Sequence, residues 1–151
     1  MRTNVYDDVK LLKGASLVPQ SFSGSTAVNG VSVDTLGADN AAVYAYGVTA
    51  SGAPTAATLA VKIQESADGS TNWTDALDNT GTAIGFTLNV HGADAENVAR
   101  IEGLNLNRKR YLRAVVTPAF TAGTSPASIG VAQIILGNNS PKPVDTTVSN
   151  T

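Results

Sequence analysis

Apolar and polar residues alternate with a period of two in several segments of the chain. In residues 57–66, Lys62 and Gln64 fall on one side of an extended backbone, and the other side carries three aliphatic residues, Leu59, Val61 and Ile63. Successive side chains of a β-strand point to opposite faces of a sheet, so this segment is predicted to be a half-buried strand. Residues 84–90 repeat the pattern with four inward-facing positions, Ile84, Phe86, Leu88 and Val90.

Four other segments are predicted to be strands from their β-branched composition and their boundaries. Residues 97–103 form a short strand, and residues 110–117 form another that ends before Pro118. Residues 41–50 alternate in a way that leaves both faces at least partly covered. Residues 127–137 are apolar on both faces, which is typical of a central strand.

Turn residues separate these segments. Asn29-Gly30 stands between valines in residues 28–34, and this is the strongest short-range signal for a β-hairpin. Asp68-Gly69-Ser70 predicts a turn into a return strand that begins near residue 72. About eight short strands with turn signals every ~8–12 residues are typical of a β-sandwich or barrel.

The predicted fold is therefore all-β, a single antiparallel β-sandwich of the immunoglobulin-like or jelly-roll-like kind, over residues 25–137. Residues 1–24 and 138–151 are predicted to be extended N- and C-terminal arms, because they contain prolines and too little apolar surface for a core. Eight side chains are expected to be largely buried: Leu59, Val61, Ile63, Phe86, Leu88, Leu112, Val131 and Ile135.

Composition and charge exclude several classes of function. The 151 residues include 10 basic and 12 acidic residues, for a net charge of -2, which argues against a general binder of nucleic acid. The chain has no cysteine and one histidine, so it offers neither a thiolate site nor a multi-histidine metal site. No apolar run approaches the ~20 residues of a membrane span, and no signal peptide is visible. We expect a soluble protein synthesised in a cytoplasm.

Three features allow site chemistry, and each has a simpler structural interpretation. Asp68, Ser70 and Asn72 alternate as calcium ligands could, but a hairpin turn explains them and the full EF-hand pattern is missing. His91 follows a strand without any nucleophile motif, and an exposed loop position is favoured. Trp73 is expected in the core, with stacking on a carbohydrate as the alternative. No catalytic residue, metal or cofactor is predicted, and the chain is not expected to be an enzyme.

Two groups of residues are candidates for contacts with a partner. Half of the basic residues of the chain fall between residues 100 and 113, and they form either a docking patch for an acidic surface or a solvated strand end with local ion pairs. The first arm carries the other group, because its few sizeable apolar side chains have no core of their own. The candidate contact residues are Leu11, Leu12, Leu17, Val18, Arg108, Arg110 and Arg113.

Three stretches resemble segments of small virion proteins of tailed bacteriophages. These are residues 61–75, residues 108–116 with the apolar strand that ends at residues 134–137, and the leader at residues 4–8. They are spread along most of the chain, from residue 4 to residue 137, and are similar to capsid decoration (cement) proteins or related head accessory proteins. The resemblance implies a structural protein on the capsid exterior, with the major capsid protein as its partner and a homo-oligomer, most often a trimer, as its assembly.

A second kind of virion protein is the alternative. A tail or head-fibre module would use the same β-sandwich to bind host-surface glycans through Trp73 and neighbouring loops. A carbohydrate-active hydrolase is disfavoured, because the chain lacks an enzyme motif.

Overall fold

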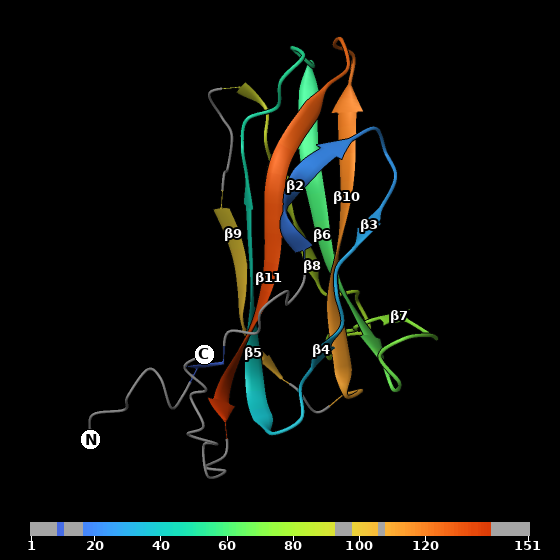
Figure 1. Ribbon diagram of the computed structural model, residues 1–151, viewed down its shortest axis with the longest axis vertical. Coiled ribbons are helices and arrows are strands. Elements are labelled where there is room, and N and C mark those ends of the chain that lie inside the picture. The colour runs from blue at the N-terminus through green and yellow to red at the C-terminus, as the bar shows by residue number, and fades with distance from the viewer. Residues whose placement is uncertain (1–8, 11–16, 93–97, 106–107, 140–151) are drawn as a thin grey trace, which may run out of the picture.

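The computed structural model describes residues 9–10, 17–92, 98–105 and 108–139 (Figure 1). These residues form β-strands joined by turns and loops, without an α-helix among them. The strands are β1 (Val9–Lys10), β2 (Leu17–Ser23), β3 (Val28–Asn29), β4 (Val33–Asp34), β5 (Ala38–Gly47), β6 (Ala56–Ser66), β7 (Thr74–Asp75), β8 (Gly85–Asn89), β9 (Val98–Asn105), β10 (Tyr111–Thr121) and β11 (Ala127–Asn139).

Two antiparallel sheets pack face to face and enclose the core (Figure 1). The first sheet has the order β1-β11-β5-β9. Strand β2 also pairs with β11, along the same edge as β1. The second has the order β3-β10-β6-β7, with β4 also on β10 and β8 also on β6. The predicted all-β sandwich is therefore confirmed, and β11 is central, as expected.

The strand order is that of a jelly roll. When β1 with β2, β3 with β4, and β7 with β8 are each counted as one interrupted strand, eight strands pair as nested hairpins. The first pairs with the last, the second with the seventh, the third with the sixth and the fourth with the fifth. This wrapping distinguishes the jelly-roll alternative from the immunoglobulin-like one.

The core positions predicted on β6 are confirmed, whereas the two predicted on β11 lie outside the core. Leu59, Val61 and Ile63 are at most 2% exposed, and Leu88 and Leu112 are buried beside them. Phe86 is half-buried against this core. The prediction for Val131 and Ile135 was wrong: both are half-exposed on the outer face, because Ala132, Ile134 and Leu136 are the residues of β11 that face the core.

The sandwich begins earlier in the chain than residue 25. Residues 17–23 form β2, which pairs with β11 and carries Phe22 into the core at 1% exposure. Residues 17–23 join the sandwich because Phe22 and Leu17 bury large apolar side chains in its core. The part of the predicted N-terminal arm that follows residue 16 therefore belongs to the sheet.

The predicted hairpin at Asn29-Gly30 was wrong. β3 and β4 do not pair with one another but follow one after the other along the free edge of β10. Neither Asn29 nor Gly30 has the positive φ that a type I′ turn requires. The amide of Gly30 instead donates to the carbonyl oxygen of Ala114, at 2.8 Å.

The strand β10 was predicted to end before Pro118, and this prediction was wrong. The strand continues to Thr121, with Pro118 opposite Leu59 of β6. The carbonyl groups of Ala114 in β10 and of Arg110 just before it accept hydrogen bonds from Gly30 and Thr35, so the carbonyl groups of even-numbered residues of the strand point away from β6 toward the edge formed by β3 and β4. The nitrogen of Pro118 points the same way, past the end of β3. Its missing N–H group therefore breaks no ladder hydrogen bond.

Candidate functional site

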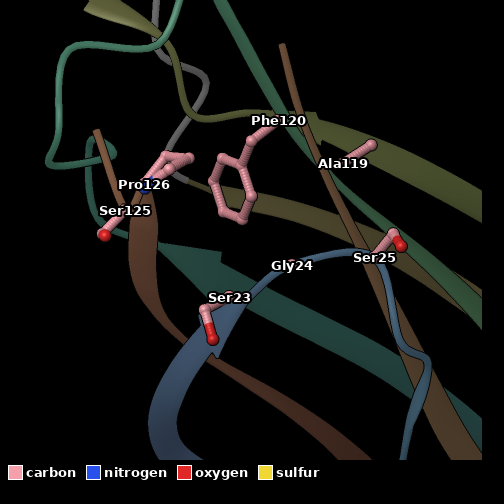
Figure 2. Close-up of a pocket in the computed structure, with 7 residues that line it drawn as sticks. All are labelled: Ser23, Gly24, Ser25, Ala119, Phe120, Ser125 and Pro126. Atoms are coloured by element: carbon pink, nitrogen blue, oxygen red, sulfur yellow. The ribbon is translucent and has the colours of Figure 1, made fainter. Parts of the chain in front are cut away.

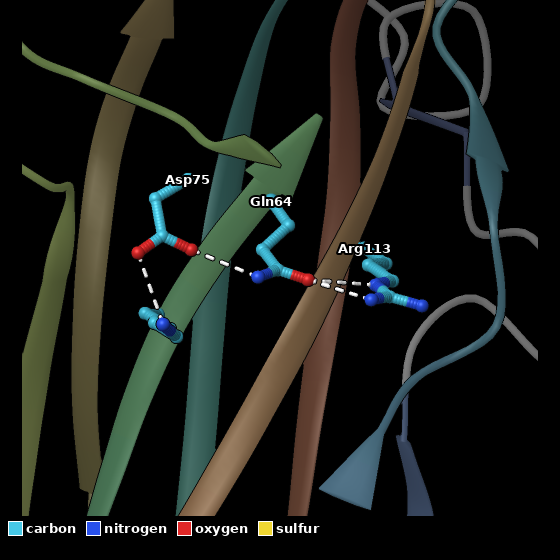
Figure 3. Close-up of polar contacts among 4 residues, drawn as sticks. Gln64, Asp75 and Arg113 are labelled. Carbon is cyan, nitrogen blue, oxygen red and sulfur yellow. Dashed lines mark hydrogen bonds and ion pairs between the residues drawn. The ribbon is translucent and has the colours of Figure 1, made fainter. Parts of the chain in front are cut away.

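A row of polar side chains crosses the outer face of the second sheet (Figure 3). Arg113 on β10, Gln64 on β6 and Asp75 on β7 lie opposite one another in register. Nε and Nη2 of Arg113 donate to Oε1 of Gln64, at 3.0 and 2.7 Å. Nε2 of Gln64 then donates to Oδ1 of Asp75 at 2.8 Å, and Nζ of Lys62 donates to Oδ2 at 2.9 Å. Each acceptor of the row is matched to a donor, so the row holds three strands together.

Arg113 also covers the ring of Trp73. Its guanidinium carbon lies 4.4 Å from the ring centre, within the range of a cation–π contact. Burial lowers the pKa of Arg113, which nevertheless remains charged at neutral pH. Trp73 is half-buried and outside the main core, contrary to the core position expected. One ring face is already occupied by Arg113, which weakens Trp73 as a carbohydrate platform.

The other candidate arginines have partners within the chain. Arg110 forms a two-pronged pair with Asp34, with Nε–Oδ1 at 2.9 Å and Nη2–Oδ2 at 2.7 Å. The hydrogen bonds that Arg110 donates to Asp34 raise the pKa of Arg110. Arg108 lies 3.7 Å from a carboxylate oxygen of Glu65 and donates to the carbonyl of Leu77. These contacts match the alternative of a strand end with local ion pairs.

The predicted basic cluster is divided between the two sheets. Arg108, Arg110 and Arg113 precede or lie on β10, and Lys109 donates to the hydroxyl of Thr74. Arg100 belongs to β9 of the opposite sheet, where its partner in register is Tyr44. Of the five basic residues that are close in sequence, four therefore lie on or next to β10, and Arg100 lies on the other sheet.

The apolar candidates of the N-terminal region differ in their positions. Leu17 is 4% exposed within the core of its own chain and is not available to a partner. Val18 belongs to β2, but its side chain lies outside the described residues. Leu11 and Leu12 also lie outside the described residues.

The loop after β6 is a turn held together by Asp68. Its carboxylate accepts hydrogen bonds from the hydroxyl and amide of Thr71, the amide of Ser70 and the hydroxyl of Ser66. These bonds, led by the one from the Thr71 hydroxyl, hold the pKa of Asp68 well below its usual range. The predicted turn is confirmed, and the carboxylate oxygens are directed to donors of their own loop. His91 is half-buried, and its amide donates to Oδ1 of Asn89.

A pocket of about 630 Å³ lies at one end of the sandwich (Figure 2). Phe120 presents its ring to it, and three serines lie around the pocket: Ser23 at the end of β2, Ser25 in the turn that follows and Ser125 in the β10–β11 loop. The lining has no ionisable side chain, so it offers no general acid or base. The lining residues are Ser23, Gly24, Ser25, Ala119, Phe120, Ser125 and Pro126.

The outer face of the first sheet carries an apolar surface that the sequence had not identified as a site. Tyr46 and Val48 at the end of β5 lie beside Ile129 and Val131 of β11. Ile129 is 56% exposed, Val48 41% and Tyr46 39%. The signal was present as apolar residues on both faces of 41–50 and 127–137. It became informative only when the register showed which of these faces is turned outward.

Comparison with protein-family models and with curated proteins gave no match to this chain. No helix in the described part of the chain has the length and hydropathy needed to cross a lipid bilayer.

Proposed function

We propose that this chain is a non-enzymatic structural protein of a bacteriophage virion, which binds the outer surface of the capsid and stabilises the shell. Its partner is the major capsid protein, and it acts as a homo-oligomer. The observation that carries the proposal is where the resembling segments lie. Residues 61–75 and 108–116 are far apart in sequence, yet they contain β7 and parts of β6 and β10, which pair along one continuous sheet.

The pairing of β6 with β10 makes this surface stiff. It runs without interruption from Tyr111 opposite Ser66 to Thr121 opposite Ala56. The polar row from Arg113 to Asp75 ties a third strand to the pair. A stiff domain placed across several capsid subunits adds contacts that must break before the subunits separate. Many copies act in parallel, so a modest energy per copy is sufficient.

The fold is compatible with this role by analogy. Jelly rolls occur in viral capsid domains and in lectins, and the same fold serves unrelated functions. The analogy therefore supports both virion roles, and the resembling segments favour the capsid.

Particle binding tests the proposal directly. Purified protein is added to capsids that lack it, and bound copies are counted after sedimentation. We expect binding to saturate at a stoichiometry comparable to the capsid lattice, and the capsids to lose their genome at a higher temperature once saturated. Saturation at a few copies per particle would instead indicate a tail component, and no binding would overturn the proposal.

The end pocket gives the glycan-binding alternative a specific site. Phe120 offers a ring for stacking, and Ser23, Ser25 and Ser125 offer hydroxyls for hydrogen bonds to a sugar. Under this alternative, a glycan array gives binding that is lost in Phe120→Ala and retained in Arg113→Ala. If the array shows no binding, the alternative is rejected.

A further inference from the structure

The outer surface of β2, β5 and β11 differs in charge from the outer face of the other sheet. The outer face of the β3-β10-β6-β7 sheet carries Lys62, Asp75 and Arg113. None of the exposed or half-exposed side chains described on β2, β5 and β11 is charged at neutral pH, and Arg100 of β9, opposite Tyr44 in register, marks the border of this surface. We call the outer surface of these three strands the neutral face, and its apolar and aromatic members away from Arg100 are Tyr46, Val48, Ile129, Val131 and Ile135.

The most exposed members of the neutral face are direct neighbours. The amide of Val48 donates to the carbonyl of Ile129 at 2.8 Å, and Tyr46 lies opposite Val131. Their side chains therefore form one continuous patch at the end of β5. Contiguous apolar patches of this kind on a folded domain mark interaction sites, whereas isolated exposed residues such as Leu77 are ordinary.

We infer that the neutral face is buried against the neutral face of a second copy of this chain, around the symmetry axis of a homo-oligomer. Residues near the axis of a cyclic assembly meet their own copies. A charged residue placed there would meet a like charge, as Arg113 would if the opposite sheet faced the axis. Tyr46, Val48 and Ile129 meet their copies without that cost, and tyrosine is enriched at the centres of interfaces.

The size of the neutral face is consistent with this occupant. β2, β5 and β11 contain 7, 10 and 13 residues. At ~3.4 Å per residue and ~4.8 Å between strands, these three strands together cover on the order of 500 Å² before side-chain relief is counted. A stable interface buries about 800 Å² per partner. The neutral face therefore supplies most of the required surface.

This inference rests on the homo-oligomer part of the proposed function but not on the capsid. The experiment is therefore performed on the purified full chain in solution, by sedimentation velocity up to about 100 µM, a concentration well above the Kd of an ordinary stable interface. We expect an oligomer for the wild type. Ile129→Lys and Val48→Lys should each weaken association by at least roughly tenfold, because both place a charge against its own copy.

Leu77→Lys is the matched control, since Leu77 is 51% exposed but lies outside the neutral face. It should associate as the wild type does. An equimolar mixture of Ile129→Lys and Ile129→Glu should associate more tightly than either variant alone, because opposite charges then meet near the axis. Thermal melts identify a variant that fails to fold, and the second lysine variant then replaces it.

Three results would overturn the inference: a monomeric wild type, equal dissociation of the Leu77→Lys control, or lysine variants that associate as tightly as the wild type. A monomer whose Tyr46 and Ile129 resist hydroxyl-radical labelling would assign the face to the terminal segments of its own chain. Capsid binding by such a monomer would leave the proposed function standing without this interface, so the two failures are distinguishable.

Discussion

The guanidinium carbon of Arg113 lies 4.4 Å from the centre of the Trp73 ring. The same side chain donates two hydrogen bonds to Oε1 of Gln64. Arg113 thereby connects β10 to β6 and to the segment that leads into β7. Side chains from three separate parts of the sequence depend on this one residue for their packing on the outer face of the sheet.

Replacing Arg113 is therefore expected to destabilise the domain. Arg113→Ala removes the cation–π contact and leaves Gln64 without its donor, for an expected loss of about 1–2 kcal/mol in the free energy of unfolding. Arg113→Lys should lose much of the same amount, because an ammonium group cannot reproduce the planar double contact. Urea unfolding followed by the fluorescence of the single tryptophan measures both variants.

Arg110→Ala serves as the control at a more exposed arginine, which also lies over an aromatic ring, with its guanidinium carbon 5.1 Å from the centre of the Tyr111 ring. The pair formed by Arg110 and Asp34 is largely open to solvent, with 48% and 39% of the side chains exposed, and exposed pairs contribute little. Unfolding midpoints that fall equally for Arg110→Ala and Arg113→Ala would show that the Trp73 contact has no special role.

Two isoleucines that the sequence placed in the core should respond differently to truncation. Ile63→Ala removes a side chain that is 0% exposed and is expected to cost roughly 2–5 kcal/mol. Ile135→Ala removes a half-exposed side chain on the outer face, so a free monomer should lose less than about 1.5 kcal/mol. Chemical denaturation of both variants gives the comparison. Equal losses would contradict the orientation described for β11.

The sequence predicts the orientation of a strand where polar and apolar residues alternate locally. The orientation of β6 was predicted because its two faces differ chemically, with Lys62 and Gln64 opposite an aliphatic row. β11 carries apolar residues at both parities, so only its register with β5 decides that Ile134 faces the core and Ile135 does not. In the same way, Asn29-Gly30 follows the edge of β10 because a distant strand offered hydrogen bonds that the local turn signal could not anticipate.

The contacts of the candidate residues also depend on long-range pairing that a local sequence pattern does not show. Arg110 and Arg113 are neighbours in sequence, but their partners Asp34 and Gln64 are 76 and 49 residues away. Charge density along the chain therefore could not show that these arginines are engaged within the domain. The neutral face was hidden for the opposite reason, because an apolar strand residue is expected in the core unless the register places it outside.

Acid should destabilise the domain through its turn and sheet carboxylates. Hydrogen bonds from Gln64 and then Lys62 lower the pKa of Asp75 in the folded protein. Bonds led by those from Thr71 and from Thr80 do the same for the pKa of Asp68 and of Asp78. A group whose folded pKa is lowered binds protons more tightly when unfolded. Its contribution is present above the unfolded pKa of ~3.9 and is lost as the pH falls through the folded value.

We therefore expect the free energy of unfolding to decrease below about pH 4, with little change from these groups between pH 5 and 8. Asp75→Asn should flatten part of this acid dependence, because the amide does not titrate. Denaturant midpoints measured from pH 2 to pH 7 (about the range over which carboxylates titrate) test this. An acid limb of unchanged slope in the variant would show that Asp75 does not contribute to it.

Gly69 and Gly81 provide a final pair of variants with the same backbone demand and different surroundings. Both have positive φ, at +74° and +82°, where an alanine is strained by roughly 1–2 kcal/mol. A Cβ at Gly81 would have no atom within 4 Å, whereas at Gly69 it would lie 2.8 Å from Cδ1 of Tyr111 and 2.9 Å from Oγ of Ser32. Tyr111 is the first residue of β10, and its ring must shift before the added methyl group fits. Gly69→Ala should therefore be more destabilising than Gly81→Ala by about 1–3 kcal/mol, the cost of overpacking. If urea unfolding gives the same loss for both, backbone strain alone accounts for the glycine at residue 69, and the contact between the turn and Tyr111 is looser than the distances indicate.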